Sequence, residues 1–330
     1  MNILIVNNGK IPVQFYGGTE RVIWYLGREL VDMGHKVSFL VDPGSSCDFA
    51  EVIAHDPLKH ISALIPAGTD IVHYNFTPPG YNEIDTPYIV TVHGNSNTQA
   101  ELDMNTVFVS GNHAQRFGSS SFVYNGLNWN DYTRPSFDVK RNYFHFLGKA
   151  AWRVKNVKGA INVIRRTRKE KLKVLGGKRF NINMGMRFTF TPRARFYGMV
   201  GGKEKFDLLQ HSKGLIFPVR WHEPFGLAII ESLYYGCPVF GTPYGSLPEL
   251  VPAEAGYLSN SCDELAKRIE DAGVYSNRYC HEYAAEHFNS KKMAFAYLER
   301  YEKVISGKKL NSKAPRLLEV PHEKFLPWEE

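Results

Sequence analysis

The sequence HEPFGLAIIE occupies residues 222–231. It follows an apolar, β-rich segment at residues 214–218, and Pro224 suits the first turn of a helix. The stretch therefore predicts a strand, a loop and a helix in succession. In this arrangement Glu223 lies at the entrance of the helix, and Glu231 lies about two turns inside it.

Glu231 does not lie on an obviously solvated stripe of the predicted helix. Its neighbours at helical spacing are Leu227, Ala228, Tyr234 and Tyr235. A carboxylate that is buried without a partner costs several kcal/mol. A carboxylate there therefore needs a partner, and two vicinal ribose hydroxyls would satisfy both of its oxygens.

The start of this helix is a candidate anion site. The backbone N–H groups of Phe225, Gly226 and Leu227 have no partners inside the helix, and such groups bind phosphates. They would suit a diphosphate or a developing negative charge. Glu223 has a simpler alternative, because an acidic side chain at this position can merely cap the helix.

The flanking sequence alternates strand-like and helical segments, which is typical of a parallel sheet. Early in the chain, a loop that ends in Gly17 and Gly18 leads from a strand into an amphipathic helix. The strands predicted for the first half are residues 2–6, 37–41, 70–74, 88–92, 106–109 and 121–124. Those predicted for the second half are residues 143–147, 173–175, 195–197, 214–218 and 238–241. This series predicts an α/β protein with two Rossmann-like, doubly wound domains.

A segment at residues 125–142 has no clear period and looks like a linker. We therefore predict a first domain at residues 1–140, a second at residues 141–305, and a tail at residues 306–330 to which the sequence assigns no role. Ligands of open α/β sheets bind outside the carboxyl ends of the strands. Two facing sheets would then share a site in the crevice between the domains.

The charge of the chain is unevenly distributed. The net charge is +7, and residues 149–205 hold 17 Lys and Arg against 2 acidic residues. Such a stretch suits an anionic partner, namely phosphate groups, an acidic membrane surface or nucleic acid, although a solvated basic face is an equally good interpretation. Nucleic acid is the weakest of these partners, because no RNA- or DNA-binding motif accompanies the charge.

Other features favour an ordinary intracellular protein. No apolar run reaches the roughly 18 residues of a membrane-spanning helix, and the chain begins with a strand-like segment instead of an export signal. The cysteines, which are Cys47, Cys237, Cys262 and Cys280, have no metal-binding spacing. We therefore expect reduced thiols and a cytoplasmic protein.

The segment that contains Glu223 and Glu231 resembles the E-x7-E signature of the retaining GT-B glycosyltransferases of family 4, the glycosyl transferases group 1. The resemblance extends over nearly the whole chain, up to about Ile305. Its further matches, in order, are Gly17-Gly18-Thr19-Glu20-Arg21, Gly34-His35-Lys36-Val37, Val72-His73, Thr91-Val92-His93-Gly94, Val109-Ser110, Asn125-Gly126, Leu147-Gly148-Lys149, Lys158-Gly159 and Gly245-Ser246-Leu247-Pro248-Glu249.

The resemblance implies a role for each matching residue. Glu231 would bind the donor ribose, and Glu223 would hold hydroxyls of the transferred sugar near the reacting carbon. Gly17 and Gly18 would let their loop approach the diphosphate or the acceptor, because a side chain would block it. His93, at a strand end in the first domain, would contact the donor sugar and help to shape the reaction centre.

Members of this family neutralise the leaving diphosphate with an Arg and a Lys after the first strand of the second domain. Here Lys149 replaces the Arg, and both Lys155 and Lys158 lie near the place of the Lys. A lysine supplies a point charge instead of a planar fork, so phosphate binding survives the change while its geometry differs.

The resemblance implies transfer with retention from a nucleotide-diphosphate sugar to a saccharide, lipid-linked or small-molecule acceptor. The sequence has no Asp-x-Asp motif, and we expect neither a metal nor another cofactor. The alternatives are a sugar phosphorylase, a nucleotide-sugar epimerase, or a non-catalytic sugar- or polyanion-binding subunit, which the change at Lys149 favours. Many relatives act on lipid-linked acceptors, but the first domain is net acidic, so membrane association is possible without being predicted.

Overall fold

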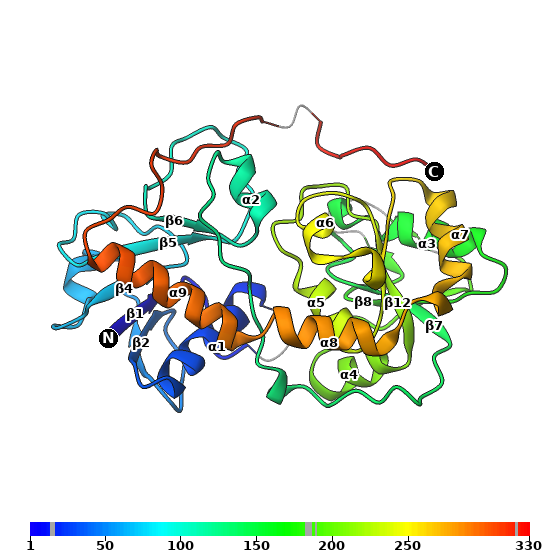
Figure 1. Ribbon diagram of the computed structural model, residues 1–330, viewed down its shortest axis with the longest axis horizontal. Helices are drawn as coiled ribbons and strands as arrows, with labels where there is room; N and C mark the ends of the chain where they lie inside the picture. The colour runs from blue at the N-terminus through cyan, green and yellow to red at the C-terminus, as the bar shows by residue number, and fades with distance from the viewer. Residues whose placement is uncertain (14–16, 182–186, 189, 321–322) are drawn as a thin grey trace. The chain divides into compact units, whose positions relative to one another are not determined.

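The computed structural model describes residues 1–330 except 14–16, 182–186, 189 and 321–322. The chain divides into two compact units (Figure 1). The first comprises Met1–Asn128 and Phe288–Pro321, and the second comprises Trp129–His287 and His322–Glu330. Each unit contains a six-stranded sheet with helices packed on it. The predicted α/β fold with two doubly wound, Rossmann-like sheets is confirmed.

The first unit is built around a sheet in which all strand pairs are parallel. Its elements are β1 (Asn2–Val6), α1 (Gly18–Asp32), β2 (Lys36–Val41), β3 (Glu51–Ala54), η1 (Ile61–Leu64), β4 (Ile71–Tyr74), β5 (Tyr88–Val92), β6 (Thr106–Phe108), α2 (Gly111–Arg116) and α9 (Ser290–Ile305). The strand order is β3-β2-β1-β4-β5-β6.

Helices α1 and α9 pack on each other and cover one face of this sheet. Gly27 lies on the buried side of α1, where a Cβ atom would overlap the ring of Phe39 on β2. Tyr301 of α9 forms a hydrogen bond with His73 on β4. Because neighbouring residues of a strand point to opposite faces, the other face carries a separate cluster, which contains Leu4, Val6, Leu40, Ile61 and Val72.

The second unit repeats this plan with another parallel sheet. Its elements are η2 (Trp129–Asp131), β7 (Tyr143–Leu147), η3 (Arg153–Lys155), α3 (Val157–Arg166), β8 (Leu172–Leu175), β9 (Phe180–Asn181), β10 (Arg187–Phe188), β11 (Ala194–Phe196), α4 (Gly202–Gln210), β12 (Ser212–Phe217), α5 (Leu227–Tyr234), β13 (Val239–Gly241), α6 (Leu247–Leu250), η4 (Ala253–Ala255), β14 (Gly256–Leu258), α7 (Cys262–Glu270), η5 (Ala272–Val274) and α8 (Asn277–His287). The strand order is β11-β8-β7-β12-β13-β14, and β9 and β10 form a separate antiparallel pair.

The alternation of side chains along β7 sets the two layers of helices in this unit. Phe144 and Phe146 belong to the hydrophobic cluster that contains the buried residues of α3 and α7. His145, between them, points to the other face and forms a hydrogen bond with Ser232 on α5. Helix α5 in turn packs on α8. The two faces of this sheet are therefore covered by different helices, α3 and α7 on one and α5 on the other.

Three local predictions differ from the structure. Residues 121–124 form no strand, since the pairing there is an isolated bridge between Phe108 and Phe122. The edge strands β3 and β14 are absent from the prediction, because they are short and β3 is not buried on either face. The sequence pattern of residues 262–275 also predicts a single helix, whereas in the structure α7 ends at Glu270 and η5 follows.

The contacts also divide the chain differently from the predicted domains. Arg141, in the predicted linker, donates hydrogen bonds to the carbonyl oxygens of Ser212 and Tyr235. The part of the predicted linker from Trp129 to Asn142 therefore belongs to the second unit. Helix α9, which was predicted in the second domain, belongs to the first unit instead, because its apolar face packs on α1 and β5.

The tail at residues 306–330 contributes to both units. Near its start, Asn311 is buried and its Nδ2 donates to the carbonyl oxygen of Met104 in the first unit. Its last residues belong to the second unit, where Leu326 and Arg220 exchange two hydrogen bonds. Trp328 packs against the hydrophobic cluster of that unit. The described residues of the tail are thus shared between the two units.

Each sheet holds a buried histidine on an inner strand. Both ring nitrogens of His73 and of His145 contact hydroxyl groups, which belong to Tyr301, Thr91, Ser212 and Ser232. Burial lowers the pKa of each ring to about 3 from the ordinary value of 6.5. Both histidines are therefore neutral near pH 7 and serve as hydrogen-bonding parts of the core.

We expect His73→Gln to destabilise the protein less at pH 5 than at pH 7.5. Below its ordinary pKa of 6.5, His73 in the unfolded chain binds a proton that the folded chain does not bind until about pH 3. The free energy of unfolding therefore decreases as the pH falls through this range, by about 2 kcal/mol at pH 5. Glutamine does not titrate, so this decrease is absent from the variant. Urea unfolding at both pH values measures the effect, and equal destabilisation at the two would contradict the prediction.

Candidate active site

The segment after β12 is where the predicted carboxylates lie. Helix α5 begins at Leu227, and Gly226 precedes it with a left-handed backbone, at φ 89°. The predicted first turn at Pro224 is therefore wrong, because Gly226 turns the chain before the helix can start. Glu223 consequently lies in the preceding loop, while Glu231 lies inside the helix as predicted.

Glu223 is buried and only partly satisfied by protein groups. Its side chain is 7% exposed. Lys155 Nζ lies 2.5 Å from Oε2, and the indole Nε1 of Trp221 donates to the same oxygen at 2.8 Å. Among the residues that the structure describes, none forms a hydrogen bond with Oε1 of Glu223. Half of this carboxylate therefore remains available to a ligand.

The backbone around Glu223 is held by the next loop of the sheet. Gly245 has a left-handed backbone, at φ 65°, and a Cβ atom there would overlap the backbone N and O of Glu223. The amide of Ser246 donates to the carbonyl oxygen of Glu223 at 2.9 Å, and its hydroxyl donates to that of Phe225 at 2.6 Å. The Gly-Ser pair of the predicted motif thus serves to fix the position of Glu223.

Glu231 is surrounded in a closely similar way. Lys205 Nζ lies 2.6 Å from its Oε1, and the side chains of Lys205 and Glu231 are 8% and 4% exposed. The hydroxyl of Tyr132 donates to the same oxygen at 2.8 Å. The burial of Glu231 agrees with its prediction as a paired carboxylate. Its partner in this structure is a lysine, which the sequence analysis did not identify.

A local signal for Lys205 exists in the sequence. On α4 it precedes Leu208 and Leu209 by three and four residues, which places the three side chains on one face of the helix. All three are buried. A lysine on the apolar face of a helix needs an anionic partner, so this spacing could have indicated the pair.

Of the two candidate phosphate lysines, the geometry favours Lys155 over Lys158. The Lys155 side chain is 12% exposed beside Glu223, whereas that of Lys158 is 72% exposed and pairs with Glu330. Gly159 also has a local explanation. The side chain of Asn156 accepts a hydrogen bond from its amide to cap α3, and a Cβ atom on Gly159 would overlap that side chain.

Lys149 is exposed at the loop after β7. Its ammonium group lies 5.4 Å from the ring centroid of Trp152, a distance at which a cation is attracted to the face of an indole. The roles of Lys149 and Lys155 at a diphosphate remain predictions.

In the first unit, Gly17 precedes α1 and Gly18 is its first residue. A Cβ atom on Gly17 would lie 2.7 Å from Oε2 of Glu20 and 2.9 Å from Cγ1 of Val13, so these side chains would have to shift to admit one. The phosphate or acceptor contact predicted for the glycine pair stays a prediction.

His93 follows β5 in the first unit and is held by Asn75. Its Nε2 lies 2.8 Å from Asn75 Oδ1, and Asn75 Nδ2 donates to the carbonyl oxygen of Val6. This orientation of the amide requires a proton on Nε2 of His93 and leaves Nδ1 as an acceptor. Burial lowers the pKa of His93 to about 4. At neutral pH the ring is therefore an uncharged acceptor.

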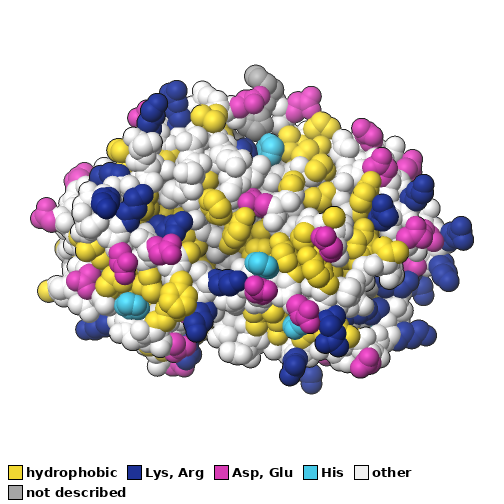
Figure 2. Space-filling model, viewed as in Figure 1, with side chains coloured by type: hydrophobic (Ala, Val, Ile, Leu, Met, Phe, Trp, Pro, Cys, Tyr) yellow, Lys and Arg dark blue, Asp and Glu magenta, His cyan; other side chains and the backbone are white. Residues whose placement is uncertain are grey.

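Several basic residues of the stretch at 149–205 form ion pairs or hydrogen bonds within the second unit. Lys155 and Lys205 pair with buried carboxylates, and Arg166 pairs with Asp263. Arg193 donates to the backbone carbonyls of Ile164, Arg165 and Thr167. Figure 2 shows Lys and Arg along the edge of this unit with Asp and Glu among them. Much of the charge is therefore structural, and this face is not uniformly basic.

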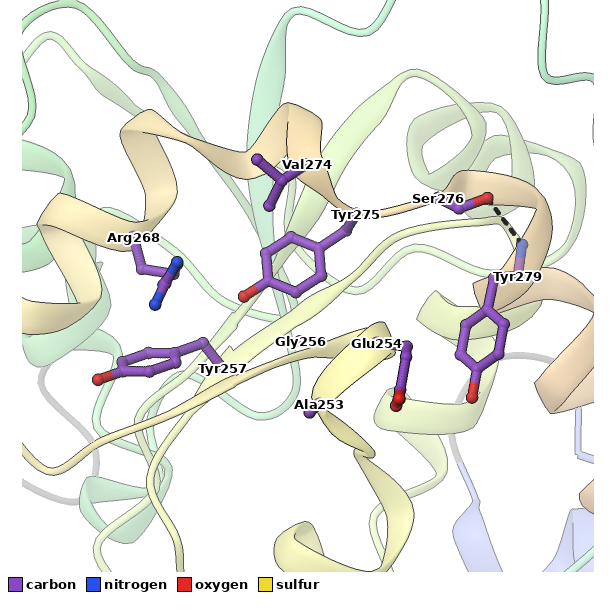
Figure 3. A pocket seen from close by; sticks show the side chains of 9 residues that line it. All are labelled: Ala253, Glu254, Gly256, Tyr257, Arg268, Val274, Tyr275, Ser276 and Tyr279. Carbon is purple, nitrogen blue, oxygen red and sulfur yellow. Dashed lines mark hydrogen bonds between the residues drawn. The ribbon is translucent and has the colours of Figure 1, made fainter.

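A depression of about 560 Å³ lies elsewhere in the second unit (Figure 3). Three tyrosine rings surround it, and the guanidinium of Arg268 lies 4.8 Å from the ring centroid of one of them, Tyr257. Its lining residues are Ala253, Glu254, Gly256, Tyr257, Arg268, Val274, Tyr275, Ser276 and Tyr279. Neither Glu223 nor Glu231 contributes to it, so it is separate from the candidate site.

Within the described ranges, no three His, Cys, Asp or Glu side chains come together as ligands for a metal ion. The four cysteines are unpaired, as expected of reduced thiols. Of the helices in the described part of the chain, none has the length and apolar character needed to cross a membrane.

Residues 141–272 match the family model described as glycosyl transferases group 1. The match runs from β7 to α7 and includes Glu223 and Glu231. It confirms the resemblance inferred from the sequence for this part of the chain. No curated protein matches the chain by sequence.

Several solved structures share the fold over nearly the whole chain. AviGT4, a glycosyltransferase involved in avilamycin A biosynthesis, has a TM-score of 0.72 at 21% identity, with 93% of this chain and 98% of that chain covered. Sucrose-phosphate synthase from Thermosynechococcus elongatus has a TM-score of 0.71 at 16% identity, with 93% and 100% covered. Anabaena HepE, solved with UDP and glucose, has a TM-score of 0.66 at 15% identity, with 92% and 100% covered. The likeness confirms the predicted GT-B fold.

We expect Lys155→Met to lower the free energy of unfolding by about 3 kcal/mol, because it leaves Glu223 buried without its cation. The double variant Lys155→Met/Glu223→Gln removes both charges and should regain most of this loss. Urea unfolding measures all three proteins.

The matched control is Lys158→Met, three residues away and exposed, which should change the stability by less than about 0.5 kcal/mol. If the two single lysine variants lost equal stability, the ion pair would not have the structural importance assigned to it.

Proposed function

We propose that this chain, whose second unit carries a glycosyl transferases group 1 domain, moves a sugar from a nucleotide-diphosphate donor to an acceptor hydroxyl with retention of configuration. The family match and the shared fold support sugar transfer from a nucleotide sugar. The proposed acceptor is a saccharide, a lipid-linked molecule or a small molecule with a free hydroxyl. We further propose that the transfer needs no metal ion.

The observation that carries the proposal is the half-satisfied carboxylate of Glu223. Two donors, Lys155 and Trp221, occupy its Oε2, while no described residue reaches its Oε1. A carboxylate oxygen that no described protein group occupies can accept hydrogen bonds from a ligand. A sugar offers several adjacent hydroxyl donors, so we assign Oε1 of Glu223 to hydroxyls of the transferred sugar.

The neighbouring groups suit the leaving diphosphate. Lys155 lies beside Glu223, and the amides at the start of α5, from Phe225 to Leu227, are the proposed cradle for its phosphates. Lys149 supplies a second, exposed cation. Positive groups that are already in place stabilise charge as it develops, without rearrangement during the reaction.

The proposed reaction breaks the bond between the anomeric carbon and the donor oxygen, and the electron pair leaves with the diphosphate. The acceptor oxygen forms its bond on the same face of the carbon, which gives retention. Its proton passes to a phosphate oxygen of the leaving group. In the first unit, we propose that the neutral ring of His93 accepts a hydrogen bond from a donor sugar hydroxyl at Nδ1.

The test of this function is transfer from a labelled nucleotide sugar. UDP-glucose is the first donor to try, because the HepE structures with a similar fold contain UDP, glucose or UDP-glucose. Sugars linked to adenosine diphosphate and to guanosine diphosphate are assayed next. Each donor is assayed once with EDTA and once with Mg²⁺. Equal rates with EDTA support the metal-independent mechanism, whereas turnover that requires inorganic phosphate would instead identify a phosphorylase.

We expect Glu223→Gln to reduce kcat by about 100-fold or more, because the amide loses the charge that organises the sugar hydroxyls and Lys155. The matched control is Glu254→Gln, an exposed residue of the same unit, which should leave kcat within about twofold. Steady-state assays at saturating donor measure both variants. Wild-type turnover in a folded Glu223→Gln protein would refute the proposed function.

A further inference from the structure

The lysine that neutralises Glu231 comes from a different helix and is itself buried. Lys205 lies on α4, and its Nζ is 2.6 Å from Glu231 Oε1. The hydroxyl of Tyr132, in the segment after η2, donates to the same oxygen at 2.8 Å. Two donors thus approach Oε1 from separate segments, and together they fix the carboxylate in one orientation.

We infer that Lys205 is a positioning residue for the donor nucleotide, and that it keeps Glu231 ionised and oriented to accept hydrogen bonds from the ribose hydroxyls. This inference rests on the proposed function, because it takes the nucleotide sugar as the ligand. Lys205 acts through Glu231 and need not touch the substrate.

Stability alone is a poor reason for this ion pair. Replacing a buried ion pair by apolar residues of similar volume is often neutral or stabilising. The surroundings of the pair are largely apolar, since the ring centroids of Tyr132 and Phe206 lie 5.7 Å and 5.5 Å from Lys205 Nζ. Apolar side chains at both positions would therefore suit the core, so the charges point to a purpose at the ligand.

The charge of Lys205 is what makes Glu231 useful as a ribose ligand. Without a cation, a carboxylate that is 4% exposed takes up a proton, because burial disfavours the charged form. A protonated carboxyl group becomes a donor at one oxygen and loses acceptor capacity. An ionised carboxylate is only an acceptor, so it can take hydrogen bonds from vicinal hydroxyls in addition to those from Lys205 and Tyr132. The lysine thus sets the hydrogen-bonding character of Glu231.

The contacts around Tyr132 support the same conclusion. The centroid of its ring lies 4.8 Å from the centroid of the Phe206 ring. The same centroid lies 5.7 Å from Lys205 Nζ. The aromatic rings enclose the ammonium group and strengthen its attraction to Glu231, because they exclude water. The group is therefore held within the unit and does not sample solvent.

The experiment compares nucleotides with and without ribose hydroxyls. UDP, ADP and GDP are screened by thermal shift, and calorimetry then compares the best binder with its 2′,3′-dideoxy form. The wild type should favour the ribonucleotide by about tenfold or more, as expected of hydrogen bonds to a charged group. Lys205→Met should weaken binding of the ribonucleotide and leave binding of the dideoxy form unchanged, so that the two affinities come within about twofold of each other.

Two variants separate positioning from general damage to the fold. Lys203→Met removes an exposed lysine of the same helix and should keep the wild-type ratio. Lys205→Arg restores the cation and should recover most of the preference for ribose. If Lys205→Met does not fold, Lys205→Gln replaces it, because glutamine keeps an N–H donor without the charge. The same ratio of ribonucleotide to dideoxynucleotide affinity is then measured.

The outcomes distinguish this inference from the proposed function. A folded Lys205→Met or Lys205→Gln protein with the wild-type ratio overturns the role of Lys205 and leaves the function intact. A wild-type protein that binds none of the nucleotides, or that ignores the ribose hydroxyls, overturns the proposed nucleotide site and the inference with it.

Discussion

The burial of two negative charges is the constraint on which the candidate site depends. An ionised carboxylate taken out of water costs several kcal/mol unless a cation and hydrogen-bond donors meet it. Glu223 and Glu231 are met in the same way, each by one lysine and one aromatic donor. These four partners come from separate parts of the second unit. The unit must therefore fold as a whole before either charge is satisfied.

The two carboxylates differ in how they are anchored, and this difference fits different tasks. Glu231 lies within α5, so the helix and the sheet beneath it fix its backbone. Glu223 lies in a loop, where Gly245 and Ser246 hold its backbone from the neighbouring loop. A loop carboxylate of this kind can present an oxygen outward while its backbone stays in place. We associate the helical residue with the nucleotide and the loop residue with the sugar.

Local patterns in the sequence revealed much of the fold. Parallel strands are buried on both faces, so they appear as apolar runs, and E-x7-E placed both carboxylates beside one strand. Edge strands such as β14 were not predicted because they are short. Lys205 and Tyr132 were not found because they are 26 and 99 residues from Glu231, and only the folded chain brings them together. The choice between Lys155 and Lys158 likewise needed their burial, since both fit the motif by spacing.

The return of the chain to the second unit bears on how proteins of this fold can be recombined. His322–Glu330 belongs to that unit, where Trp328 packs on its hydrophobic cluster and Glu329 bonds to Asn260 and Cys262. A chimaera that imports this half from a relative therefore needs two splice junctions. A graft that ended after α8 would lack Trp328, which packs on the cluster, and Glu329, which forms hydrogen bonds with Asn260 and Cys262 after β14. Hybrid proteins built from this fold should carry residues 322–330 together with the second unit.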